Sequence, residues 1–246
     1  MAISNFFSNT HFAETAHITG GRVKDAEVRN IFGYQQTGDT TLRAVWEFAN
    51  IDYIFPVAAQ AMTVTSANAA DDGKLMLIKG LDDEYNEITE TVTLTGAGDV
   101  ITTNLFYRIN DIIMLTGVTN IGLITVQDGG KTIKYGGIRA GDGRNQASIF
   151  TVPASKSFYL YRIDAFSSDT TAGKPAIFRN FSQTKTGQQY NTARTSFLGN
   201  MHIMRRLPFK YSQCTDIQFQ LATFQGSHEL SVFGEGVLLT ERGTNL

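Results

Sequence analysis

The sequence predicts an all-β protein with two antiparallel β-sandwich domains of jelly-roll-like type, preceded by an irregular, aromatic-rich N-terminal arm. Three observations lead to this fold class. Apolar and Thr-rich polar residues alternate with a period of two along many short segments. Turns rich in Gly, Asp and Asn separate these segments about every 8–12 residues, and no long helical pattern is present.

The clearest pattern is a β-hairpin between Leu75 and Leu94. An apolar run ends at Leu81, an acidic turn follows over residues 82–86, and Ile88, Val92 and Leu94 then alternate with threonines. β-Branched residues at period two, interrupted by Asp and Asn, are typical of two strands that bury one face. The turn residues Asp82, Glu84 and Asn86 could hold Ca²⁺ through their oxygens, but a solvated strand-connecting turn is the preferred interpretation.

Residues 1–55 differ from the remainder because their aromatic residues stand in a polar context without a clear strand period. Residues 22–29 are compatible with two turns of helix, although their apolar positions fit neither period well. Such an arm can bury its aromatics against its own domain or against a neighbouring subunit, and the sequence leaves both open. The predicted partner-binding residues of the arm are Phe6, Phe7, Phe12, Phe32, Tyr34, Trp46 and Phe48. Removal of residues 2–30 is expected to leave a folded protein that no longer binds its partner.

The strand pattern then divides into two domains. The first β-sandwich domain is predicted over residues 56–141, with strands at 62–65, 75–81, 88–94, 105–109 and 120–126, among others. Glycines cluster between 136 and 143, after which the pattern restarts. The second β-sandwich domain is predicted over residues 142–246 and includes the alternating stretch 215–221.

Composition excludes several classes of protein. Charged residues make up 18% of the 246 residues, below the usual ~25%, and the net charge of −2 gives no electrostatic case for nucleic acid or an anionic membrane. The single cysteine, Cys214, cannot form an internal disulfide, and no base or cation adjoins it, so a small buried residue is the preferred interpretation. No signal peptide or apolar run of ~20 residues is seen, which indicates assembly in the cytoplasm.

No catalytic or metal-binding signature stands out. The four histidines, His11, His17, His202 and His228, are scattered and lack partners at metal-ligand spacing. No nucleophile-elbow motif is present, although a Ser-His-Asp arrangement cannot be judged from one sequence because its members meet only in the fold. The sequence therefore predicts a protein that is not an enzyme and needs no cofactor.

Several motifs resemble virion structural proteins of tailed bacteriophages and prophages. They are the hairpin sequence from Gly80 to Gly96, Phe106-Tyr-Arg-Ile-Asn110, Asn120-Ile-Gly-Leu-Ile-Thr-Val126, and Ile149-Phe-Thr-Val-Pro-Ala-Ser-Lys156. The likeness covers about residues 30–165, and it departs from the family pattern at Thr89 and Ser155. These motifs are turn and strand signatures, so the resemblance implies a building block of a particle and does not fix its position.

From this resemblance we expect a capsid decoration or cement protein located in the virion, assembled in the host cytoplasm. Its expected partners are the major capsid protein or other virion proteins, and itself as a homo-oligomer, most simply a trimer. A tail, baseplate or fibre position is an alternative. A carbohydrate-binding module that contacts the host surface is another, and it would need an exposed aromatic platform from Tyr159, Tyr161 and Tyr190.

Overall fold

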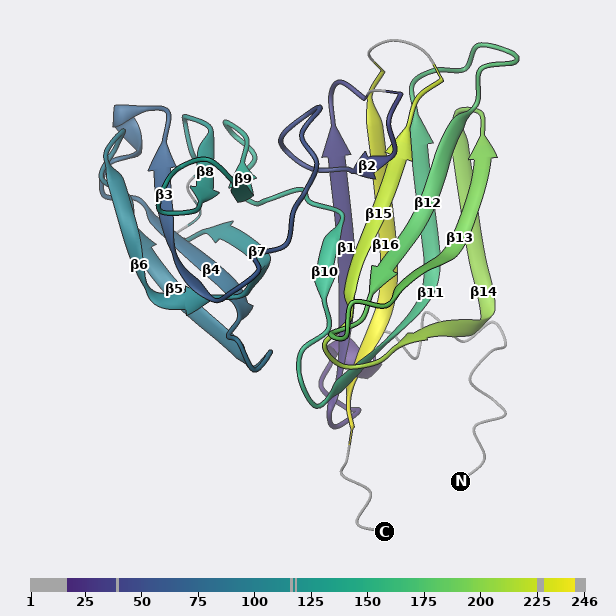
Figure 1. The fold of residues 1–246 in the computed structure, drawn as a ribbon, viewed down its shortest axis with the longest axis horizontal. Coiled ribbons are helices and arrows are strands. Elements are labelled where there is room, and N and C mark those ends of the chain that lie inside the picture. Colours follow the sequence, from purple (N-terminus) through teal and green to yellow (C-terminus); the bar gives the residue numbers. More distant parts are fainter. Residues whose placement is uncertain (1–16, 39, 116, 118, 225–227, 242–246) are drawn as a thin grey trace.

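The computed structural model consists of two β-sandwiches that lie side by side (Figure 1). It describes residues 17–38, 40–115, 117, 119–224 and 228–241. All strand pairs are antiparallel, and the prediction of an all-β sandwich fold is confirmed. Within the described ranges, no helix is long and apolar enough to cross a bilayer.

The smaller sandwich, which we call the insert, has seven strands in two sheets. One sheet has the order β6-β3-β8-β9 and the other β5-β4-β7. The bounds are β3 Gln60–Ser66, β4 Leu75–Leu81, β5 Glu87–Thr93, β6 Asp99–Phe106, β7 Arg108–Met114, β8 Ile124–Gln127 and β9 Lys134–Ile138. The predicted hairpin is β4 paired with β5, from Leu75 opposite Thr93 to Leu81 opposite Glu87.

The larger sandwich pairs a sheet of order β1-β16-β11-β14 with a sheet of order β10-β15-β12-β13, and β2 adds to β15 beside β10. The bounds are β1 Ala26–Gln35, β2 Arg43–Ala44, β10 Ile149–Thr151, β11 Lys156–Ser167, β12 Ala176–Gln183, β13 Gln189–Phe197, β14 Asn200–Tyr211, β15 Asp216–Ala222 and β16 Leu230–Thr240. When β1 and β10–β16 are counted from one to eight, the sheets read 1-8-3-6 and 2-7-4-5, the strand order of a jelly roll. We call this part the jelly roll.

The jelly roll is discontinuous in sequence, because its first strand precedes the insert and its second follows it. Strands β3–β9 lie inside the predicted range 56–141 and β10–β16 inside 142–246, whereas β1 and β2 come from the range predicted as an irregular arm. The two turns of helix considered for residues 22–29 are not formed. Ala26 to Gln35 instead pair along their whole length with β16, because alternate residues such as Ile31 and Gly33 meet the core.

Each sandwich has its own apolar core. The insert is filled by a cluster that includes Met62, Met76, Ile78 and Phe106, and the jelly roll by one that includes Phe158, Phe178 and Phe219. The core of the jelly roll also contains Ile31 and Val45, from either side of β2. A deletion of residues 2–30 would remove half of β1. The structure therefore revises the expectation about this truncation, which should now destabilise the jelly roll.

The chain leaves the jelly roll and re-enters it at one point, where Val45, Ser148 and Phe219 are joined. The Ser148 N–H donates to the Val45 carbonyl at 2.8 Å, the Val45 N–H donates to Ser148 Oγ at 2.9 Å, and Ser148 Oγ donates to the Phe219 carbonyl at 2.6 Å. Gly33 of β1 packs against Val45 and Ser148 at this point. A Cβ at this position would stand 2.3 Å from the Val45 oxygen and 2.6 Å from Ser148 Cβ.

We predict that Gly33→Ala destabilises the protein by about 1–3 kcal/mol, because the added methyl group must displace backbone atoms in a packed interior. Urea unfolding measures the change. Gly129→Ala is the matched control, since nothing lies within 4 Å of a Cβ at Gly129. Equal unfolding midpoints for the two variants would contradict the close approach of β1 to this crossing point.

Candidate partner-binding surface

Two of the predicted partner-binding residues, Trp46 and Phe48, are buried where the insert meets the jelly roll. Trp46 is fully buried, and its ring meets those of Phe48 at 4.9 Å and Tyr53 at 5.1 Å in edge-on geometry. Ile149 of β10 belongs to the same cluster. This aromatic run therefore packs within its own chain, which is one of the two arrangements that the sequence leaves open, and the two buried side chains offer almost no surface to a partner.

Phe32 and Tyr34 lie on β1 and differ in their surroundings. Phe32 is 42% exposed and faces outward from the sheet. Tyr34 is half-buried: the Arg139 guanidinium lies 4.8 Å from its ring centre, and its hydroxyl donates to Glu229 Oε1 at 3.3 Å. Phe6, Phe7 and Phe12 fall outside the described residues. Partner binding by the arm therefore stays a prediction, and among the described residues the exposed side chain of Phe32 is available for it.

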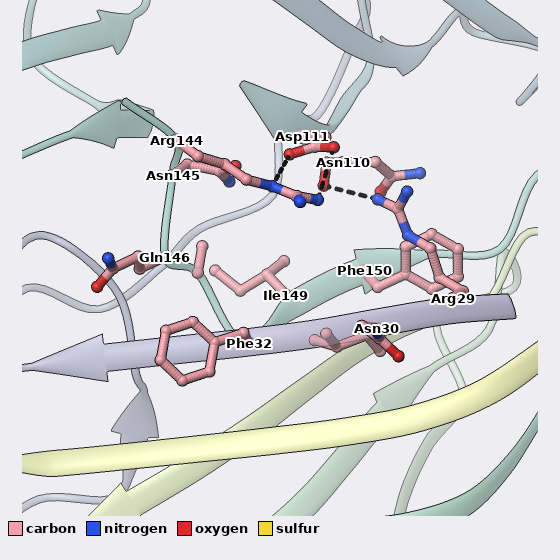
Figure 2. Close-up of a pocket in the computed structure, with 12 residues that line it drawn as sticks. Arg29, Asn30, Phe32, Asn110, Asp111, Arg144, Asn145, Gln146, Ile149 and Phe150 are labelled. Atoms are coloured by element: carbon pink, nitrogen blue, oxygen red, sulfur yellow. Dashed lines mark hydrogen bonds and ion pairs between the residues drawn. The ribbon is translucent and has the colours of Figure 1, made fainter. Parts of the chain in front are cut away.

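A cavity of about 180 Å³ separates β1 from the insert. Figure 2 shows Arg29, Asn30 and Phe32 along β1 on one side, with Asn110, Asp111 and Arg144 on the other. The Arg29 Nη2 donates to the Asn110 carbonyl at 3.1 Å, and its guanidinium lies 5.0 Å from the Phe150 ring centre. Arg144 forms two contacts with Asp111, at 3.0 and 2.9 Å. The Arg29 contact with Asn110 links the two sandwiches across the cavity, and the Arg144–Asp111 pair lies on the insert side.

A buried ion pair also joins the sandwiches, between Arg108 on β7 and Asp216 on β15. Nε and Nη2 of Arg108 donate to the two carboxylate oxygens at 2.8 and 2.9 Å, and both residues are buried. Asp216 also accepts from Thr151 Oγ1 at 2.6 Å, and Arg108 Nη1 donates to the Pro56 carbonyl at 2.9 Å. The guanidinium stacks on Tyr107 at 3.9 Å. A bidentate, fully hydrogen-bonded pair of this kind fixes orientation as well as contact.

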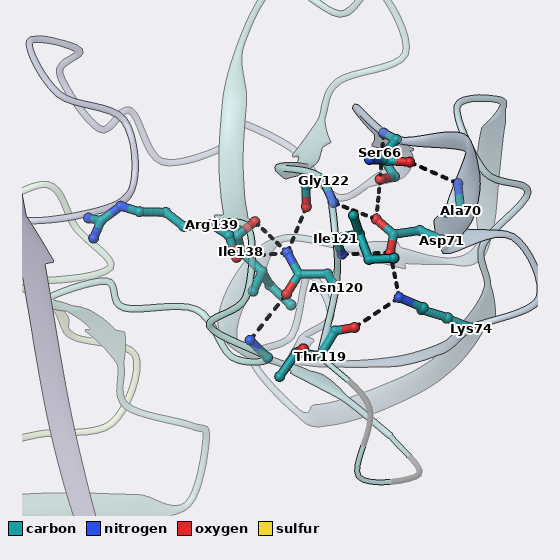
Figure 3. A network of polar contacts seen from close by, with 12 residues as sticks. Ser66, Ala70, Asp71, Lys74, Thr119, Asn120, Ile121, Gly122, Ile138 and Arg139 are labelled. Atoms are coloured by element: carbon teal, nitrogen blue, oxygen red, sulfur yellow. Dashed lines mark hydrogen bonds and ion pairs between the residues drawn. The ribbon is translucent and has the colours of Figure 1, made fainter.

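The insert carries a second buried polar network, around Asp71 and Asn120 (Figure 3). Burial opposes ionisation of Asp71, but hydrogen bonds from Lys74 and Ser66 and from the Ile121 and Gly122 N–H groups outweigh it and hold its pKa well below the usual range. Because both carboxylate oxygens are occupied, the network fixes the loop before β8. No group of three or more His, Cys, Asp or Glu among the described residues could hold a metal ion.

Glu47, between Trp46 and Phe48 at the junction of the two sandwiches, has a side-chain pKa shifted close to neutrality. Burial raises its pKa to about 7, although it accepts a hydrogen bond from the Gln146 N–H and lies near Arg139. Its other oxygen has no hydrogen-bond partner within the described part of the chain. The carboxyl group is therefore protonated in the folded protein below neutral pH.

The other candidate sites resolve into structural features. Asp82 accepts the Glu84 and Asn86 N–H groups at 3.0 and 2.8 Å, as a turn-forming side chain does. Cys214 is buried, and burial raises the pKa of its thiol, which disfavours the reactive thiolate. Tyr159 and Tyr161 lie on β11 and Tyr190 on β13, which belong to different sheets, so the three do not form one platform.

Sequence reasoning missed the residues that join the two sandwiches. Arg108, Asn110 and Asp111 stand inside an otherwise apolar stretch, Phe106 to Met114, and all three are at least partly buried. Charged side chains on a buried strand are rare unless they are paired. This signal could have identified β7 as the strand that contacts another domain, although not its partner Asp216.

Comparisons with known proteins leave the family open. No protein-family profile matches the chain, and no curated protein sequence matches it. Among solved structures, the chain is similar to the STIV MCP (10% identity, 85% of this chain and 96% of that chain, TM-score 0.23) and to a structure of infectious bursal disease virus Gx strain (11%, 90% and 73%, 0.25). It is also similar to the PBSX exported protein XepA (12%, 86% and 86%, 0.19). Scores this low carry no argument about fold or function.

We predict that Arg108→Met destabilises the protein by about 3–5 kcal/mol, because it leaves the Asp216 carboxylate buried without a counter-ion. Arg43→Met is the control. Arg43 pairs with the exposed Asp52 at 2.8 Å, and such surface pairs contribute about 0–1 kcal/mol. Urea unfolding compares the two variants, and similar losses would show that the Arg108–Asp216 pair does not stabilise the junction.

A second prediction concerns pH. Glu47 has a raised pKa in the folded state, so the folded protein retains a proton that the unfolded chain loses above about pH 4.5. The stability from this group is complete below that pH and is lost as pH rises to about 7. Between pH 5 and 8 the loss should be about 2–3 kcal/mol, and Glu47→Gln should remove it. Identical pH slopes in wild type and Glu47→Gln, measured by urea unfolding at both pH values, would refute the assignment.

Proposed function

We propose that this chain is a non-enzymatic structural component of a tailed-phage virion, and specifically a capsid decoration protein that stabilises the shell. The resemblance of residues 30–165 to such virion proteins supports the class. The jelly roll with an inserted second sandwich is compatible with it, since this architecture offers a wide, rigid surface without requiring a reactive centre. The proposed partners are the major capsid protein and further copies of this chain, most simply in a trimer.

The structural observation that carries the proposal is a group of exposed apolar side chains in a groove between the insert and the β12–β13 turn. Val57 is 94% exposed and Leu105 on β6 is 55% exposed. With Ala58, Ala59 and Ile88 they line the apolar part of a groove of about 660 Å³, and Asp82, Asp83, Asn104 and Lys185 supply its polar part. Ile101, also on β6, extends the apolar stripe along the same strand. Exposed apolar residues gathered in this way are typical of a protein–protein contact.

We assign this groove to the capsid surface because the insert projects away from the bulk of the jelly roll (Figure 1). A flat lattice of coat subunits can be contacted by the insert while the jelly rolls meet one another. Many weak contacts of this kind add up to firm attachment when copies are linked. A tail, baseplate or fibre position keeps the structural role and changes only the number of copies.

The expected result is that purified particles contain this chain in a ratio near one to one with the major coat protein, or a simple lattice fraction of it. Quantitative mass spectrometry of the particle gives the ratio. A count of about 6–18 copies, as expected for rings around a tail axis, would overturn the decoration role and favour a tail component. Absence from the particle would overturn the structural proposal altogether.

A further inference from the structure

Strand β13, at the side of the jelly roll away from the insert, is an open sheet edge (Figure 1). It pairs with β12 on one side only, from Gln189 opposite Gln183 to Phe197 opposite Ala176. Six of its nine residues are exposed. An open edge presents unpaired N–H and C=O groups that can pair with another chain, and proteins usually block such edges.

Other edges of this molecule are blocked by side chains. On β6, the Glu90 carboxylate accepts the N–H groups of Thr103 and Asn104, both at 2.8 Å. On β10, the Asn110 amide imitates a neighbouring strand, since it accepts the Thr151 N–H at 2.8 Å and donates to the Thr151 carbonyl at 2.9 Å. Both devices use groups that a pairing strand would otherwise occupy.

The outer strands of the sheet β1-β16-β11-β14 are protected in other ways. On β1, the Tyr34 N–H donates to the Gln146 carbonyl at 3.2 Å. Strand β14 contains Pro208 and a bulge. Met204 pairs with Arg162 and Phe209 pairs with Leu160, so that residues 205–208 of β14 stand opposite Tyr161 alone. Proline and bulges are recognised means of preventing strand addition.

Strand β13 has little of this protection. It contains no proline and a single charged residue, Arg194, and its one irregularity lies opposite Asn180 and Phe181. Residues 193–197 beyond that irregularity form an uninterrupted pairing segment. In the described part of the chain, no side chain of another element forms a hydrogen bond with the backbone of β13. This edge is therefore prepared for a partner strand.

The charge at this edge indicates what the partner carries. Arg194 stands directly opposite Arg179 of β12, and like charges in that position are destabilising. In the described part of the chain, neither guanidinium has a carboxylate within ion-pair distance. Arg179 donates through Nε to Gln220 Oε1 at 2.6 Å, which fixes its position. Burial, and then the charge of Arg194, lower the pKa of Arg179.

We propose that β13 receives an added strand from a partner polypeptide, with a glutamate or aspartate of that strand placed opposite Arg194. The backbone of the partner pairs with residues 193–197, and its carboxylate neutralises the two arginines. A second copy of β13 does not fit this requirement, because the strand carries no carboxylate to place opposite Arg194. The inference concerns residues 193–197 of the sheet edge and holds whether or not the chain is a capsid decoration protein.

The experiment uses fluorescently labelled eight-residue peptides of Thr and Val with one central Glu, or with Lys in its place, titrated to about 1 mM against the full chain and followed by anisotropy. The Glu peptide should bind at least about tenfold more tightly than the Lys peptide. A tenfold difference in Kd corresponds to about 1.4 kcal/mol of binding free energy. Arg194→Glu should reverse this preference. Arg206→Glu, which makes the same charge change on β14, should leave it unchanged.

A Glu peptide methylated on alternate backbone nitrogens separates strand pairing from simple charge attraction, and it should bind at least about tenfold more weakly. The proposal is overturned if the Glu peptide does not bind, if the methylated peptide binds equally well, or if Arg206→Glu acts like Arg194→Glu. Binding of polygalacturonate without binding of the peptide would assign the arginines to an acidic polysaccharide. A dimer held by β13, detected by sedimentation of the chain alone, would assign the edge to a second copy. Both results overturn the proposal.

Discussion

The buried pair between Arg108 and Asp216 determines how the two sandwiches are joined. A domain inserted between the first two strands of a jelly roll is attached by two chain crossings that lie side by side, and such an attachment acts as a hinge unless another contact restrains it. Arg108 supplies this contact because it reaches from the insert to Asp216 at the start of β15 in the jelly roll. The cluster around Trp46 and the Arg29 and Arg144 contacts then fill the space on either side. Two sandwiches with separate apolar cores are thereby fixed in one arrangement.

The hairpin from Leu75 to Leu94 shows what could be predicted from the sequence. Its strands are neighbours in the chain, so local alternation and turn residues were sufficient to place it. The same holds for β15, where Ile217, Phe219 and Leu221 alternate. In both cases the residues that identify the strand and its buried face stand within a few positions of one another in the sequence.

The discontinuous domain could not be predicted in this way. Strand β1 is defined by pairing with β16, about 200 residues later, and no local pattern reports a partner at that distance. The aromatic run at Trp46 and Phe48 could not be placed for a related reason. The sequence leaves open whether these aromatics pack on their own chain or on a neighbouring subunit, and the fold buries them at the junction between two domains that the sequence shows only as successive units. The unblocked edge at β13 also depends on which strands end each sheet, so it is visible only in the fold.

The position of the insert has a consequence for how the protein folds during synthesis. All strands of the insert lie in one continuous stretch, so it can fold as soon as that stretch has left the ribosome. Strand β1 emerges earlier but has to wait for β16, the last strand, before its hydrogen bonds are made. The jelly roll therefore has a high contact order and a late closing step, which is typical of slow folding. During that interval an already folded insert holds its two chain crossings side by side, so that β1 and β10 are close together before β16 arrives.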